Sequence, residues 1–193
     1  LDFQPVIALQ GDGSEMYEMY LHLYGSDGEP VEASTYLPID EEHGLLGQID
    51  RWAVARTREL QAEVIEAYRN YDFHLIYQKV HNFCVVDLGG FYLDVIKDRL
   101  YTTPARGLPR RSAQTAMQAI AEAMVRWLAP ILSFTAEEIW RHMPGTRPES
   151  VFFSTWSMLP TVAETATLVK WPALLEARGA VLRELERLRV AGQ

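Results

Sequence analysis

Residues 97–111 concentrate positive charge in a chain that is acidic as a whole. Five cations stand in this stretch against a single carboxylate, Asp98, whereas the whole chain has a formal charge of -8. The five cations are Lys97, Arg99, Arg106, Arg110 and Arg111. Clustered cations neutralise phosphates, so the pattern indicates a surface for a polyanion such as RNA. The alternative interpretation is an ordinary solvated surface.

The expected helix ends separate these cations into two groups. We expect one helix to end near Leu100 and another to start near Pro109. Unpaired carbonyls at a helix end favour cations, so the helix dipole alone can explain Lys97 and Arg99. Arg110 and Arg111 stand at a helix start, where the dipole disfavours them, and this placement predicts an external anion.

Neighbouring side chains extend the predicted site. Gln114 adds a polar group one turn after the two arginines. Tyr101 and Trp52 could stack on unpaired bases, with core packing as the alternative for both rings. The candidate RNA-binding residues are therefore Lys97, Arg99, Tyr101, Arg110, Arg111, Gln114 and Trp52.

Catalytic motifs are absent from the sequence. No phosphate-binding glycine loop and no nucleophile elbow occurs. Cys84 lies in the apolar run NFCVV, where a thiol is usually inert. His74 and His81 share a helix face but lack the carboxylate that would indicate a metal site. We expect no catalytic residue, metal or cofactor in this chain, and an enzyme based on Cys84 or the histidines is the alternative.

The composition predicts a folded and mostly helical protein. Apolar residues make up 48% of the 193 residues, enough for a hydrophobic core. The single cysteine excludes an internal disulfide and fits a cytoplasmic location. No apolar run reaches 18 residues, so we expect no membrane span.

The charge distribution suggests three segments. Residues 1–50 contain 11 Asp or Glu and no Lys or Arg, which leaves a net charge of +3 on residues 51–193. We expect an acidic N-terminal arm over residues 1–46, irregular or forming a β-hairpin around the turn sequence GSDG. An all-α helical bundle should follow over residues 47–160, and a C-terminal connecting helix over residues 161–193.

Periodicity and turn residues place the helices. Asp50 and Asp72 are expected to cap the first two helices, and a capping box of Thr135 and Glu138 the fourth. The second helix should be central and run to about Leu100, with Gly89-Gly90 marking a bend or close packing. Residues 149–156 should lie extended over the bundle.

Several segments carry a family resemblance. They are DRWAV (50–54), YDFHLIYQKVHNFC (71–84), FYLDVIKDRLY (91–101), RRSAQT (110–115), LAPILSFTAEEIW (128–140) and ESVFFSTW (149–156). In order and spacing they resemble the anticodon-binding domain of bacterial isoleucyl-tRNA synthetases. The last helix resembles the connecting segment that follows in those enzymes.

The resemblance implies a helical bundle of the class I synthetase type that binds the anticodon stem and loop of isoleucine tRNA. The parent enzyme would join isoleucine to this tRNA with ATP and Mg, and a zinc tail could follow outside this chain. The HIGH and KMSKS signatures of the catalytic domain are absent here. The expected partners are isoleucine tRNA and the remaining synthetase domains. The alternative is a synthetase-derived protein–protein interaction module.

Overall fold

The computed structural model describes residues 2–6, 16–20, 23–24, 30–31, 45–162 and 168–190. The chain divides into two compact units, residues 1–43 and residues 44–193. The first unit contains two short antiparallel strand pairs. Strand β1 (Asp2–Val6) pairs with β2 (Met16–Tyr20), and β3 (Leu23–Tyr24) pairs with β4 (Pro30–Val31). The second pair flanks GSDG in sequence, where a hairpin is expected, whereas the first pair was not predicted.

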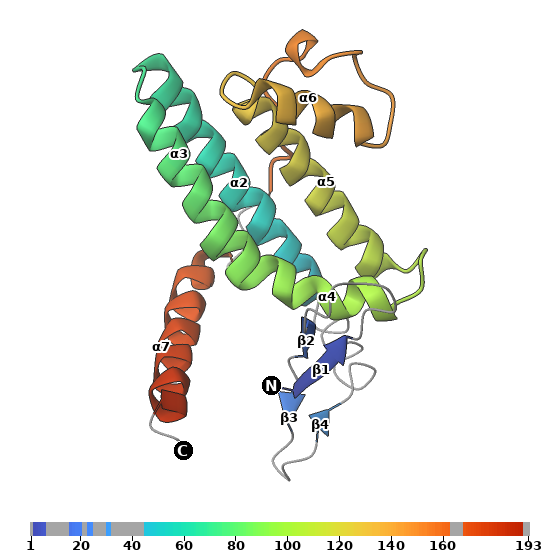
Figure 1. Cartoon of the computed structure of the whole chain (residues 1–193), viewed down its shortest axis with the longest axis vertical. Coiled ribbons are helices and arrows are strands. Elements are labelled where there is room, and N and C mark those ends of the chain that lie inside the picture. Colours follow the sequence, from blue (N-terminus) through green and yellow to red (C-terminus); the bar gives the residue numbers. More distant parts are fainter. Residues whose placement is uncertain are drawn as a thin grey trace. The chain divides into compact units, whose positions relative to one another are not determined.

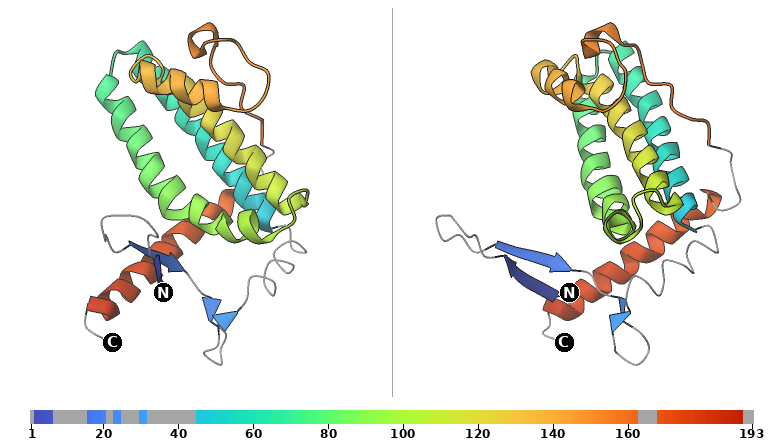
Figure 2. Two further views of the ribbon diagram at one scale, coloured as in Figure 1. Left: turned by 45° about the vertical axis from the view of Figure 1, so that its right-hand side comes forward. Right: turned by 90° about the vertical axis from the view of Figure 1, so that its right-hand side faces the viewer.

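The second unit is an all-α bundle, as the sequence predicts (Figure 1). Its elements are α2 (Leu45–Arg69), α3 (Phe73–Asn82), η1 (Phe83–Tyr92), α4 (Leu93–Thr102), α5 (Leu108–Leu128), α6 (Ser133–His142), η2 (Val151–Phe153), η3 (Leu168–Lys170) and α7 (Trp171–Val190). The α2–α3 turn and the α4–α5 loop lie at opposite ends of the bundle (Figures 1 and 2).

Helix α2 is the centre of the core. Leu60 and Val64 on α2 are fully buried, and α2 packs against both α3 and α5. Burying each such side chain stabilises the fold by about 1.5–3 kcal/mol. Trp127 of α5 is also fully buried and donates its indole N–H to Gln61 Oε1 at 3.0 Å, so the largest core side chain keeps its polar group paired.

Residues 73–102 form one continuous rod whose middle part is π-helical. In η1 the backbone bonds span five residues, as in the bond from Leu93 N–H to the Leu88 carbonyl. A Cβ at Gly89 or Gly90 would lie 3.0 Å from the carbonyl oxygen five residues earlier. The sequence predicts a bend or close packing at this glycine pair. The structure shows close packing against the rod's own backbone, which is possible because glycine has no Cβ.

Two predicted helix caps are wrong, and a third is confirmed in position but not in its side-chain bond. Helix α2 begins at Leu45, so Asp50 lies within it, because apolar residues before Asp50 extend the helix backwards. Asp72 does occupy the cap position of α3, but its side chain makes no capping bond. Helix α6 starts at Ser133, one turn before a Thr135–Glu138 box could act, and its cap position, Leu132, likewise makes no side-chain capping bond.

Residues 143–162 return along the bundle after α6. The expected extended segment contains one short turn, η2, whose Val151 is buried. Glu137 holds this turn, because its carboxylate accepts bonds from the Ser150 hydroxyl at 2.9 Å and the Val151 N–H at 3.2 Å. Farther on, Gln61 donates to the Ser157 carbonyl at 2.9 Å, which fixes the returning segment to α2.

Candidate nucleic-acid interface

The loop between α4 and α5 places the predicted cations. Thr103 is extended before Pro104, which ends α4 because a residue before proline disfavours the helical conformation. The N–H of Gly107 then donates to the Pro104 carbonyl at 2.8 Å, and a Cβ at Gly107 would lie 3.0 Å from that oxygen. This tight turn starts α5 at Leu108, with proline in its first turn.

Arg99 does not lie on the surface. Its guanidinium is 1% exposed and donates two hydrogen bonds to the Asp50 carboxylate, at 3.1 and 2.5 Å. Asp50 also accepts from the Tyr92 hydroxyl at 2.9 Å and the Ser112 hydroxyl at 2.5 Å. Burial raises the pKa of Tyr92, and the nearby Asp50 charge raises it further, so the phenol remains a donor. The expected RNA contact of Arg99 is corrected: this cation joins α4 to Asp50 of α2, and Ser112 of α5 bonds to the same carboxylate.

Trp52 is also a core residue. Its ring is 8% exposed and stands edge-on to Phe91, with ring centres 5.1 Å apart. Trp171 lies against the same pair, at 5.8 Å from Trp52 and 5.9 Å from Phe91. An unpaired base could not reach Trp52 without displacing these rings, so the stacking role expected for Trp52 is corrected to core packing.

The remaining predicted residues lie at or near the surface. Tyr101 is 82% exposed, and Arg111 and Gln114 are exposed on α5. Lys97 is exposed as well and forms an ion pair with Asp94 at 3.1 Å, one helical turn away. Arg110 is partly buried and donates to the Thr103 carbonyl at 3.5 Å, so it helps to hold the loop.

A groove beside the start of α5 brings together three arginines. It has a volume of about 690 Å³ and is lined by residues of α2, the α4–α5 loop, α5 and the returning segment 160–162. Arg51, Arg106 and Arg111 line it, and all three are exposed. Within the described residues none of the three forms an ion pair, whereas Asp50 at the groove already accepts bonds from three side chains.

This groove can attract an anion. Three unpaired guanidiniums supply planar, paired donors that suit phosphate oxygens. The start of α5 adds backbone N–H groups and the positive end of the helix dipole. Arg51 is not among the residues predicted from the sequence, because it lies outside the cation cluster of residues 97–111 and only the fold brings it beside Arg106 and Arg111. Arg106 belongs to that cluster but is not among the predicted site residues.

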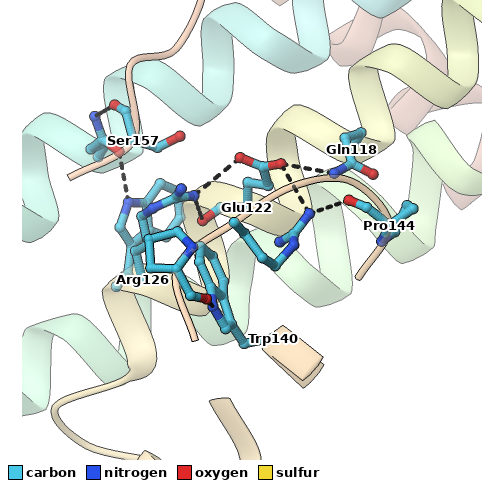
Figure 3. Close-up of polar contacts among 10 residues, drawn as sticks. Gln118, Glu122, Arg126, Trp140, Pro144 and Ser157 are labelled. Atoms are coloured by element: carbon cyan, nitrogen blue, oxygen red, sulfur yellow. Dashed lines mark hydrogen bonds and ion pairs between the residues drawn. The ribbon is translucent and has the colours of Figure 1, made fainter. Parts of the chain in front are cut away.

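A second pair of arginines behaves differently. Arg126 and Arg147 place their guanidinium carbons 4.8 and 4.7 Å from the ring centre of Trp140. Arg126 also donates a hydrogen bond to the Glu122 carboxylate at 3.2 Å. The same carboxylate accepts a bond from the Gln118 side chain at 2.8 Å (Figure 3). Burial by itself raises the pKa of Glu122, but the bonds from Gln118 and Arg126 and the charges of both arginines outweigh it, and the pKa is lowered. These cations hold the fold together.

Exposed aromatic side chains occur near the opposite end of the bundle from the arginine groove. Tyr71 and Phe73 follow the end of α2, and Phe152 and Phe153 belong to η2; all four rings are at least half exposed. Tyr71 has a φ of 60° where glycine is more usual, which turns the chain from α2 into α3. Exposed rings of this kind can stack on unpaired bases. Helical periodicity does not indicate this surface, because the four rings come from two turns that are far apart in the sequence and are brought to the same end of the bundle only by the fold.

Three further features of the part of the chain that the structure describes are its possible metal ligands, its single thiol and the apolarity of its helices. No group of three or more His, Cys, Asp or Glu could hold a metal ion there. Cys84 is partly buried against the core, and burial raises the pKa of its thiol. None of the described helices has the length and apolarity needed to cross a membrane.

Comparisons with known proteins agree with the fold. Residues 50–193 match the family described as anticodon-binding domain of tRNA ligase. The chain is 62% identical over 143 residues to the isoleucine–tRNA ligase of Halorhodospira halophila, covering 73% of this chain and 15% of that protein. It is 57% identical over 148 residues to that of Nitrosococcus oceani, covering 75% and 16%. It thus spans about one sixth of the length of these relatives.

Proposed function

Because the chain belongs to the family of anticodon-binding domains of tRNA ligases, we propose that it is the anticodon stem-loop binding module of an isoleucine–tRNA ligase. The relatives named above are isoleucine–tRNA ligases across the matched region, which favours isoleucine tRNA as the ligand. The whole ligase would attach isoleucine to this tRNA with ATP and Mg in the cytoplasm. That chemistry, and any zinc site, would belong to segments outside this chain.

The observation that carries the proposal is the arginine groove beside the start of α5. Its three cations lack acidic partners among the described residues, in a chain whose other arginines mostly have them. Phosphates of the RNA backbone would bind Arg51, Arg106 and Arg111, and Lys97 and Tyr101 lie on the neighbouring end of α4. The comparisons give no support to the alternative of a protein–protein interaction module.

The test measures tRNA binding at two salt concentrations. The double variant Arg106→Ala/Arg111→Ala should weaken binding of isoleucine tRNA at least about tenfold at low salt. Because each lost phosphate contact removes about 0.7–0.9 from the slope of log K against log salt, that slope should become shallower by about 1.4–1.8.

A matched control removes the same charge elsewhere. Arg187 and Arg189 are exposed on α7 and pair with Glu184 and Glu186. The variant Arg187→Ala/Arg189→Ala should keep the wild-type slope. Equal losses in the two variants would mean that only overall charge matters, and no loss in the groove variant would refute the proposed surface. Equal affinity for isoleucine tRNA and for a tRNA with another anticodon would refute the proposed specificity.

A further inference from the structure

Helix α7 docks on the bundle through its first half. Trp171 packs against Trp52 and Phe91, and Leu175 lies against the same core. Arg178 donates to the Gly90 carbonyl at 2.8 Å, and its guanidinium carbon lies 5.2 Å from the Phe91 ring centre. The docking surface therefore includes the π-helical segment η1.

The apolar face of α7 continues beyond this docked part. At about 100° per residue, Leu182 and Leu185 fall on the same side of the helix as Trp171, Leu175 and Arg178. They are nevertheless 46% and 56% exposed, and Val181 beside them is 59% exposed. Figures 1 and 2 show the C-terminal half of α7 extending away from the bundle. The apolar face by which α7 docks therefore continues past the bundle, and its side chains are exposed there.

The opposite face of α7 is polar. Arg183 and Arg187 lie on it, and Arg187 pairs with Glu184 at its border, at 2.6 Å. A one-sided apolar pattern indicates a surface that packs against another element. A ten-residue helical extension is marginally stable in water without such packing. The second half of α7 therefore needs a partner for its apolar stripe, which consists of Val181, Leu182, Leu185 and Leu188.

We propose that this apolar stripe is covered by the remainder of the isoleucine–tRNA ligase polypeptide. The proposal rests on the proposed function, and two observations support it. The stripe continues the interface by which α7 already docks within the chain. The relatives contain about six times the length of the matched region, so most of the polypeptide is available to cover it.

A second copy of this chain fits the stripe less well. Specific dimers bury about 1,200–2,000 Å² in total. Four partly exposed aliphatic side chains on each copy fall well short of that area. The partner surface should therefore be apolar and held close by the covalent continuity of one polypeptide, which raises its effective concentration.

Hydrogen exchange of α7 tests the proposal. Backbone amides of residues 181–190 are compared in the 193-residue chain and in the full-length ligase polypeptide that carries it. In the chain alone they should exchange within about tenfold of an unfolded peptide, and in the full-length protein at least about 100-fold more slowly. Equal exchange in the two proteins would overturn the proposal.

Two matched variants identify the face that is covered. Leu182→Gln/Leu185→Gln should speed the exchange of these amides in the full-length protein at least about tenfold. Arg183→Gln/Arg187→Gln changes the opposite face and should leave the protection intact. If instead the 193-residue chain sediments as a dimer that only the leucine variant dissociates, a second copy occupies the stripe and the proposal is wrong.

The tRNA measurement separates this proposal from the proposed function. The leucine variant leaves the arginine groove intact, so its affinity for isoleucine tRNA should stay within about twofold of wild type. Unprotected α7 in a full-length protein that still binds tRNA would refute the covered stripe alone. Protected α7 in a protein without tRNA affinity would refute the proposed function alone.

Discussion

Replacing Arg99 by Met should destabilise the bundle without weakening RNA binding by the folded protein. Arg99 is nearly fully buried and donates two hydrogen bonds to Asp50, which lies 49 residues earlier in the chain. Methionine keeps much of the aliphatic stem but removes the guanidinium. Asp50 would then remain buried with only the hydroxyls of Tyr92 and Ser112 as donors.

The structure sets the size of this effect. Removing one partner of a buried ion pair costs about 3–5 kcal/mol, because it leaves an uncompensated charge. The two hydroxyl donors still stabilise Asp50, so we expect a loss near the lower end, about 3 kcal/mol. For a unit of this size, 1 kcal/mol shifts the melting temperature by about 2–4 °C, which predicts a fall of about 6–12 °C.

Lys97→Met is the matched control. It also replaces a cation of α4 by methionine, but Lys97 is 57% exposed and its ion pair with Asp94 lies on the surface. Such pairs contribute about 0–1 kcal/mol. Thermal unfolding followed by circular dichroism compares the variants, and tRNA binding is measured at a temperature where both are folded. An Arg99→Met melting temperature no lower than that of Lys97→Met would refute the reasoning, as would a tenfold loss of tRNA affinity in folded Arg99→Met.

Two further predictions follow from groups with shifted pKa values. Because the pKa of Glu122 is lowered in the fold, its carboxylate stabilises the protein above the ordinary value of 4.5, and this contribution is lost as the pH falls through the lower folded pKa. The melting temperature of Glu122→Gln should therefore lie below that of wild type at pH 7 and approach it at pH 3.5; a constant difference would contradict the lowered pKa. Because burial raises the pKa of Cys84, native protein at pH 7.5 should react with iodoacetamide at least about tenfold more slowly than urea-unfolded protein, and equal rates would show a thiol that burial does not protect.

Local patterns were enough to predict the helices and most of their ends. Pro104 and Pro109 mark the loop between α4 and α5, and that loop forms where the sequence indicates it. The family resemblance predicted the anticodon-binding fold, which the matching family confirms.

The role of each cation could not be predicted in the same way. Lys97 and Arg99 look alike in the sequence, since both stand in the last turns of the same helix and the helix dipole explains both. Arg99 points to a carboxylate 49 residues away, whereas Lys97 pairs with Asp94 on the surface. Helix-end reasoning counts only local neighbours, so it cannot detect a partner that tertiary packing supplies. The same limitation explains why Trp52 was assigned to RNA and why Arg51 was missed.

The π-helical segment also determines how the chain tolerates insertions and deletions. Each wider turn of η1 takes in one more residue than an α-turn, so η1 sets the rotation of everything that follows it in the rod. Deleting one residue from the rod, with its remaining turns unchanged, would rotate α4 by about 100° relative to α3. Arg99 would then turn away from Asp50, and α4 would lose its buried ion pair with α2. The buried ion pair between Arg99 and Asp50 therefore forms only if η1 keeps its number of residues.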